Sequence, residues 1–196
     1  MFKGHRLPVE EIIRRILNGL ADYKSEVNSD PIQIMVNPLF FGDGPIGFFD
    51  GAAKDERNGI RLFLKVSSNH CYRAHMAVGT GSNIRAELIT FWGILSLSLR
   101  LDFQSISISI AGDSKVVIDW FNNKAALNVM DLQHWKDMIR EMSSSFHSLQ
   151  VFHVHRQYNV VADSLSKEGL LRNSRILYVE EFEEGEKINS WAFTIF

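Results

Sequence analysis

The chain has 196 residues, a length that suits one domain with short extensions. Hydrophobic residues make up 45% of it and charged residues 22%, a composition that excludes a wholly disordered chain. The formal net charge of −2 excludes a strongly basic protein that coats nucleic acid.

The sequence contains no apolar run of about 18 residues or more, so we expect no membrane-spanning helix. Its first residues lack the apolar core of a signal peptide. The single cysteine, Cys71, excludes an internal disulfide and a multi-cysteine zinc site. These features predict an intracellular protein of a reducing compartment, without separating nucleus from cytoplasm.

Charge is distributed unevenly along the chain. Residues 46–170 hold thirteen basic and twelve acidic residues, whereas residues 171–196 hold three basic residues and five glutamates. The five glutamates lie between positions 180 and 186, a cluster typical of a solvated turn or tail. The middle of the chain is therefore slightly basic despite the negative total.

The first 45 residues read as a helix and a linker. Residues 8–27 have the apolar spacing of an amphipathic helix, with Pro8 in its first turn. SDP at 29–31 and NP at 37–38 interrupt the chain. We expect this helix to pack on the domain or on a partner.

The next segments alternate between strand and helix patterns. Residues 46–50, 59–67 and 71–78 are strand candidates with a turn near Ser68, which predicts three antiparallel strands. A helix capped by Ser82 or Asn83 follows and runs to about Leu99. The remaining expected elements are a strand at 105–110, helices at 114–121 and 131–146, a strand at 151–155 and a helix from Asn159 to Gly169.

This order predicts an α/β fold with one mixed five-stranded sheet flanked by helices. We expect the sheet domain to span residues 46–170 and residues 171–196 to form a C-terminal tail with the acidic cluster. Large apolar residues alternate in WAFTIF at 191–196, which favours an edge strand over a docking peptide. Residues 8–27 and 188–196 are candidate surfaces for a protein partner or a second copy.

Four carboxylates stand at the ends of these elements. Asp50 ends an apolar strand, Glu87 lies in the first turns of the long helix, Asp113 follows the alternating strand, and Asp163 lies near the start of the last helix. Binding crevices in such sheets form where strands end. Carboxylates gathered at one spot repel one another unless they take up protons or bind cations, and an all-oxygen cluster suits Mg²⁺ or Mn²⁺.

The ordered motifs resemble a known family. DG at 50–51, NIRAE at 83–87, GDS at 112–114 and NVVAD at 159–163 resemble the type 1 ribonuclease H fold with its Asp-Glu-Asp-Asp metal cluster. HVHRQYNVVADSLSKEGL at 153–170 resembles most closely the plant ribonuclease H-like domains related to retroelement reverse transcriptases. The resemblance implies an endonuclease that hydrolyses the RNA strand of RNA–DNA hybrids with two Mg²⁺ or Mn²⁺ ions.

The resemblance also implies roles for single residues. The metal ligands and catalytic core would be Asp50, Glu87, Asp113 and Asp163. The residues that approach the nucleic acid would be Gly51, Ser82, Asn83 and Arg85.

Some features depart from the family pattern. The second strand has few glycines, and the KAALN segment at 124–128 is short where bacterial members carry a basic protrusion. His153 and His155 precede the last motif, and we interpret both as structural or surface residues. These departures keep open an alternative, a nucleic-acid-binding or interaction domain of the same fold with little or no turnover.

Overall fold

The computed structural model describes residues 44–54, 57–155 and 176–194. These residues belong to one compact unit, which spans Asp43–Phe196. The helices predicted at 8–27 and at 159–169, and with the latter Asp163, lie outside the described residues.

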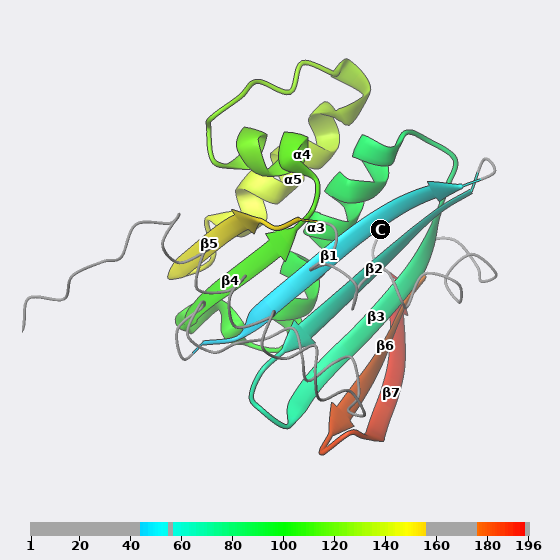
Figure 1. Cartoon of the computed structure of the whole chain (residues 1–196), viewed down its shortest axis with the longest axis vertical. Helices are drawn as coiled ribbons and strands as arrows, with labels where there is room; N and C mark the ends of the chain where they lie inside the picture. The colour runs from blue at the N-terminus through cyan, green and yellow to red at the C-terminus, as the bar shows by residue number, and fades with distance from the viewer. Residues whose placement is uncertain (1–43, 55–56, 156–175, 195–196) are drawn as a thin grey trace, which may run out of the picture. The chain divides into compact units, whose positions relative to one another are not determined.

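The centre of the sheet agrees with the prediction. Strands β1 (Ile46–Lys54), β2 (Arg57–Lys65) and β3 (His70–Gly79) pair antiparallel in chain order. Strand β4 (Ser107–Gly112) lies parallel beside β1, and β5 (Ser148–His153) lies parallel beside β4 (Figure 1). The prediction that the first strand ends at Asp50 is wrong, because β1 continues in its pairing with β2 to Lys54 and Asp50 lies within it. The adjacency of β1 and β4 still brings Asp50 close to Asp113, which follows β4.

The sheet is wider than the five strands expected from the sequence. Strands β6 (Ile176–Glu183) and β7 (Glu186–Thr194) form a hairpin beside β3, which gives the order β5-β4-β1-β2-β3-β6-β7. Much of the segment predicted as a tail is therefore part of the sheet. Leu177 and Val179 of β6 face the core with 0% and 1% exposure. In the sequence this alternation is too short to predict a strand next to the five glutamates that follow it. The expected edge strand near the C-terminus is confirmed, because β7 is an edge of the sheet.

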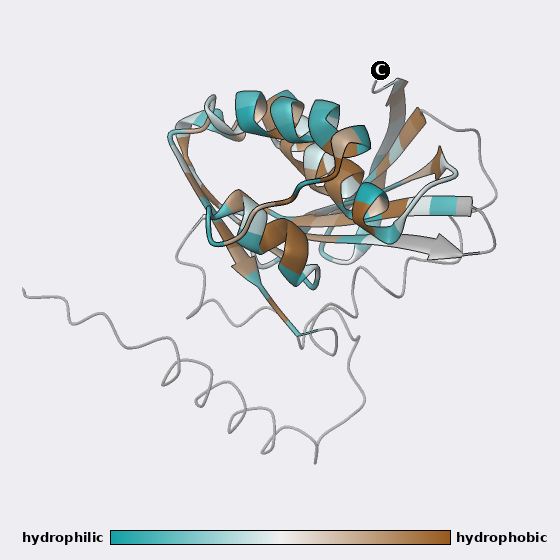
Figure 2. Cartoon of the chain, turned by 90° about the horizontal axis from the view of Figure 1, so that it is seen from above, coloured by the Kyte–Doolittle hydropathy of each residue, from teal (hydrophilic) through white to brown (hydrophobic). Residues whose placement is uncertain are grey.

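Three helices complete the described fold. Helix α3 (Asn83–Arg100) packs on β1 and β2, and both α4 (Lys115–Phe121) and α5 (Gln133–Ser143) contact α3. Helix α5 is shorter than predicted, because residues 130–132 form a separate 3₁₀ turn. Seen along the sheet, hydrophobic residues gather where the helices meet the strands (Figure 2). None of the described helices is both long and apolar enough to cross a membrane.

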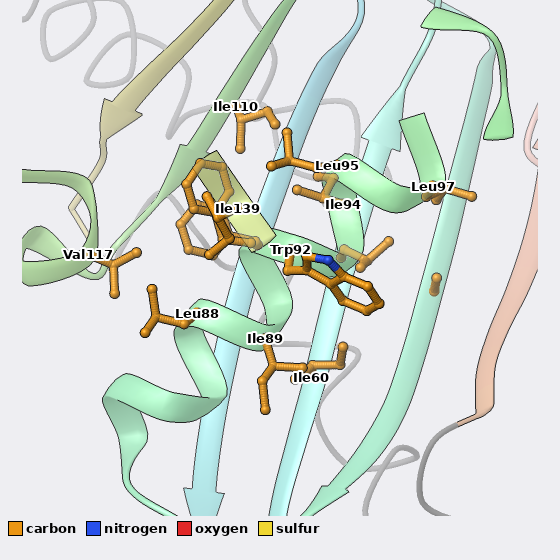
Figure 3. Close-up of a cluster of buried hydrophobic side chains, with 14 of the residues drawn as sticks. Ile60, Leu88, Ile89, Trp92, Ile94, Leu95, Leu97, Ile110, Val117 and Ile139 are labelled. Carbon is orange, nitrogen blue, oxygen red and sulfur yellow. The ribbon is translucent and has the colours of Figure 1, made fainter. Parts of the chain in front are cut away.

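The core lies between α3 and the sheet. Leu88 and Ile89 of α3 are fully buried, and Trp92 is 4% exposed among side chains from the sheet, α4 and α5 (Figure 3). Phe49 of β1 stacks on Phe91 of α3 with ring centroids 5.2 Å apart. Burial of these side chains on both sides of α3 fixes the helix against β1, the strand that carries Asp50.

A half-buried carboxylate, Glu181, joins the hairpin to β3. The Tyr72 hydroxyl donates to Glu181 Oε1 over 2.9 Å, and His70 Nε2 lies 2.8 Å from the same oxygen. Burial alone would raise the pKa of Glu181, but hydrogen bonds from Tyr72, His70 and Asn189 hold it below its usual value. Burial and the neighbouring Glu181 carboxylate in turn raise the pKa of Tyr72, so its hydroxyl stays a donor.

The hairpin's contribution to stability can be tested with one buried and one exposed residue. Leu177→Ala removes a fully buried side chain, so we expect it to lower the free energy of unfolding by about 2–4 kcal/mol. Ile188→Ala on β7 changes a side chain that is 53% exposed and should stay within about 0.5 kcal/mol of the wild type. Urea unfolding measures both, and equal effects would contradict an integral hairpin.

Acid should loosen the same junction. The pKa of Glu181 is depressed in the fold, so its stabilisation is complete above its unfolded value of 4.5 and is lost as the pH falls below it. In Glu181→Gln the urea midpoint should therefore fall less steeply below pH 4.5 than in the wild type. Glu183→Gln, which alters an exposed carboxylate of the same strand, should keep the wild-type slope. Identical slopes in all three proteins would contradict this role of Glu181.

Candidate metal centre

Two of the predicted carboxylates meet where the pairing of β1 with β4 ends. The last paired residues are Phe49 and Gly112, and each is followed directly by an aspartate, Asp50 and Asp113. Because the strands are parallel, the two aspartates come side by side, Asp113 just after β4 and Asp50 within β1 where β4 stops pairing with it. Open α/β sheets bind ligands near the carboxyl ends of such strands.

The third carboxylate comes from α3, which approaches β1 very closely. A Cβ atom on Gly51 would lie 2.4 Å from both the carbonyl carbon of Ala86 and the backbone nitrogen of Glu87. Only glycine allows this contact, because any side chain would collide with the helix backbone. The contact places Glu87 beside the strand that carries Asp50.

The three carboxylates form one cluster. Asp50, Glu87 and Asp113 each offer an oxygen, and these oxygens all lie within 4.8 Å of one another. Asp50 is 7% exposed and Glu87 is 8% exposed, whereas Asp113 is half-buried. The predicted convergence of these three residues is confirmed as geometry. Asp163, the fourth predicted ligand, lies outside the described residues.

A buried cation accompanies the cluster. Arg61 of β2 is paired with Asp50 in the strand register, and its Nη1 lies 3.7 Å from Asp50 Oδ2. A role for Arg61 was not predicted from the sequence. The sequence does contain a signal for Arg61: a charged residue interrupts the apolar run GIRLFL. In the same way, Asp50 follows the apolar run GFF. A charged residue inside a buried strand needs a partner, whatever its sign.

The donor set suits a hard divalent cation. All three described ligand candidates are carboxylates, and oxygen ligands at this spacing are preferred by Mg²⁺ and Mn²⁺ over zinc. Three like charges in a partly buried crevice also disfavour one another unless cations neutralise them. The residues therefore fit a metal ion that prefers oxygen ligands.

The residues predicted to meet nucleic acid lie around the start of α3. Ser82 is the N-cap, and its Oγ accepts from the backbone nitrogen of Arg85 over 3.2 Å. The Arg85 guanidinium donates to the carbonyl oxygens of Val78 and Thr80 over 3.0 and 2.8 Å, which ties down the loop before the helix. Asn83 is exposed at the first helical position. Ser82 and Arg85 thus have structural roles, and their contacts with a substrate stay predictions.

His153 and His155 lie at the end of β5, on the surface. Both are exposed, and their ring centroids are 5.8 Å apart. This placement agrees with their interpretation as surface residues.

The chain matches a known protein family over most of its length. Residues 49–169 match the family described as reverse transcriptase-like, which covers more than half of the sequence. The chain belongs to the reverse transcriptase-like family. No curated protein matches the chain significantly. The closer relationship to plant members of this family stays a prediction.

Solved structures show the same fold as this family member. Ribonuclease H1 from the halophilic archaeon Halobacterium salinarum has a TM-score of 0.58 at 23% identity, over 64% of this chain and 96% of that one. LC11 ribonuclease H1, solved in complex with an RNA/DNA hybrid, has a TM-score of 0.59 at 17% identity, over 64% and 96%. The N-terminal ribonuclease H domain of a Mycobacterium tuberculosis protein scores 0.58 at 18% identity, over 65% and 93%. The fold is therefore ribonuclease H-like, as the sequence predicts.

The contact at Gly51 gives a direct test of how the cluster is assembled. Gly51→Ala puts a methyl group against the backbone of α3, so we expect a loss of about 1–3 kcal/mol in the free energy of unfolding. Gly79→Asn is the matched control, because Gly79 has φ of +72° with open space around its Cβ, a conformation that asparagine tolerates. Urea unfolding should show the larger loss for Gly51→Ala, and the reverse order would contradict the close approach.

Proposed function

We propose that the protein is a metal-dependent endonuclease that hydrolyses the RNA strand of RNA–DNA hybrids with two Mg²⁺ or Mn²⁺ ions. The observation that carries the proposal is the cluster of Asp50, Glu87 and Asp113 within 4.8 Å, at the place in a ribonuclease H-like fold where β4 ends beside β1. Membership of the reverse transcriptase-like family supports it.

The carboxylates would hold the ions. Asp50 and Asp113 from neighbouring strands and Glu87 from α3 supply oxygens from three directions, with Asp163 proposed as the fourth ligand on the strength of its motif. Divalent ions at these ligands would supply activation of a water nucleophile and stabilisation of the leaving oxygen of a phosphodiester. The tight packing of α3 on β1 keeps the carboxylates in place before any ion binds.

The start of α3 is the proposed contact with the hybrid. Asn83 is exposed one helical turn before Glu87. The space beside Gly51 is filled by the backbone of α3, so a contact of Gly51 with the hybrid rests on the family resemblance alone. Ser82 and Arg85 would act mainly by holding this loop in shape. LC11 ribonuclease H1, which shares the fold, was solved with an RNA/DNA hybrid bound. Hybrids can be recognised by minor-groove shape and 2′-hydroxyls without reading of sequence.

A second candidate function is a nucleic-acid-binding or interaction domain with little or no turnover. One observation favours it: Arg61 already places a positive charge beside Asp50 and so partly replaces a metal ion. This function predicts hybrid binding that persists in EDTA, together with no cleavage in Mg²⁺.

Cleavage of a labelled hybrid decides between the two. The purified protein should cut the RNA strand in Mg²⁺ and lose activity in EDTA, and Asp113→Asn should lower the rate by more than about 100-fold because it removes a proposed ligand. Asp137→Asn on α5 is the control, since Asp137 is an exposed carboxylate held by Gln133 outside the cluster. Residual activity equal in wild type and Asp113→Asn would indicate a contaminating nuclease and contradict the proposal.

A further inference from the structure

Arg61 is the most deeply buried charged side chain at the candidate metal centre. It is 1% exposed, and its neighbours in the strand register are Asp50 on β1 and His75 on β3. His75 is 9% exposed and stacks on Tyr178 of β6, with ring centroids 5.6 Å apart. A row of polar and aromatic side chains thus crosses one face of the sheet and ends at the carboxylates.

The charge of Arg61 is permanent. A guanidinium does not lose its proton in a protein, so a buried arginine is held by carboxylates or other acceptors. The described cluster carries three carboxylates, and Arg61 lies within ion-pair distance of one of them. It therefore reduces the formal charge of the described cluster from −3 to −2.

A fixed cation beside a ligand acts on the ion in two opposing ways. It orients the Asp50 carboxylate and lessens repulsion among the three acids, which favours the assembled site in the absence of metal. It also repels a divalent ion bound to the same carboxylate, which weakens binding. Loss of the guanidinium should therefore destabilise the metal-free protein and tighten metal binding at the same time.

We propose that Arg61 is a positioning residue that acts as the built-in counter-ion of the carboxylate cluster: it holds Asp50 in place without metal and weakens the affinity of the site for divalent ions. The inference rests on the proposed function, because it concerns the same metal site. Arg61 would then have a regulatory effect, because a site with lower affinity for divalent ions binds them only at a higher ion concentration.

The test uses the full chain, stripped with EDTA and titrated with Mn²⁺, with free Mn²⁺ measured by electron paramagnetic resonance. Arg61→Met should bind Mn²⁺ about tenfold more tightly than the wild type, because one neighbouring positive charge is gone. The same variant should unfold at a lower urea concentration in EDTA. Arg73→Met is the matched control, because Arg73 lies on β3 with its guanidinium 4.4 Å from the ring centroid of Phe182. It should leave Mn²⁺ affinity unchanged.

Weaker or unchanged Mn²⁺ binding in folded Arg61→Met would overturn the inference. Removal of an arginine with a purely structural role would lower the Mn²⁺ affinity or leave it unchanged. If Arg61→Met does not fold, Arg61→Lys replaces it: the charge is kept, so wild-type Mn²⁺ affinity supports the inference and tighter binding overturns it. No Mn²⁺ binding in any protein, the wild type included, would instead overturn the proposed metal-dependent function and the metal part of this inference with it. A loss of stability in EDTA that persists equally in an Asp50→Asn background would show that Arg61 does not act through Asp50.

Discussion

The close packing of α3 against the backbone of β1 is the constraint on which the site depends. At Gly51 the helix backbone occupies the space that a side chain would need, and this brings Glu87 beside the part of β1 that carries Asp50. Phe49, next in the chain, stacks on Phe91 of the same helix and holds the two elements together. Hydrophobic packing on one side of the sheet thus fixes the position of carboxylates at its end.

The electrostatics of the site follow from that placement. Packing brings like charges together at a partly buried position, which is unfavourable unless cations compensate them. Arg61 supplies part of this compensation from inside the fold, and bound ions would supply the rest. Under the proposed function, the site would combine a permanent charge, which aids folding, with exchangeable metal charges, which serve chemistry. The balance between the two would set how readily this site binds metal.

Much of this arrangement could be predicted from the sequence, because the signals are local. Strand alternation and helix periodicity give the order of elements, and a charged residue at a strand end marks Asp50 and Asp113 as unusual. Strand β6 and its pairing with β7 were not predicted, since the glutamates that surround the turn mask the short buried pattern at Leu177 and Val179. The partnership of Arg61 with Asp50 was not predicted either, because it depends on the register between two strands and not on spacing along one.

Anomalous diffraction from crystals soaked in Mn²⁺ is the most direct test of the proposed metal site. We expect Mn²⁺ bound by carboxylate oxygens of Asp50, Glu87 and Asp113, where β4 ends beside β1 and next to the first turns of α3. Crystals soaked in millimolar Mn²⁺ that show no anomalous signal among these three carboxylates would contradict it.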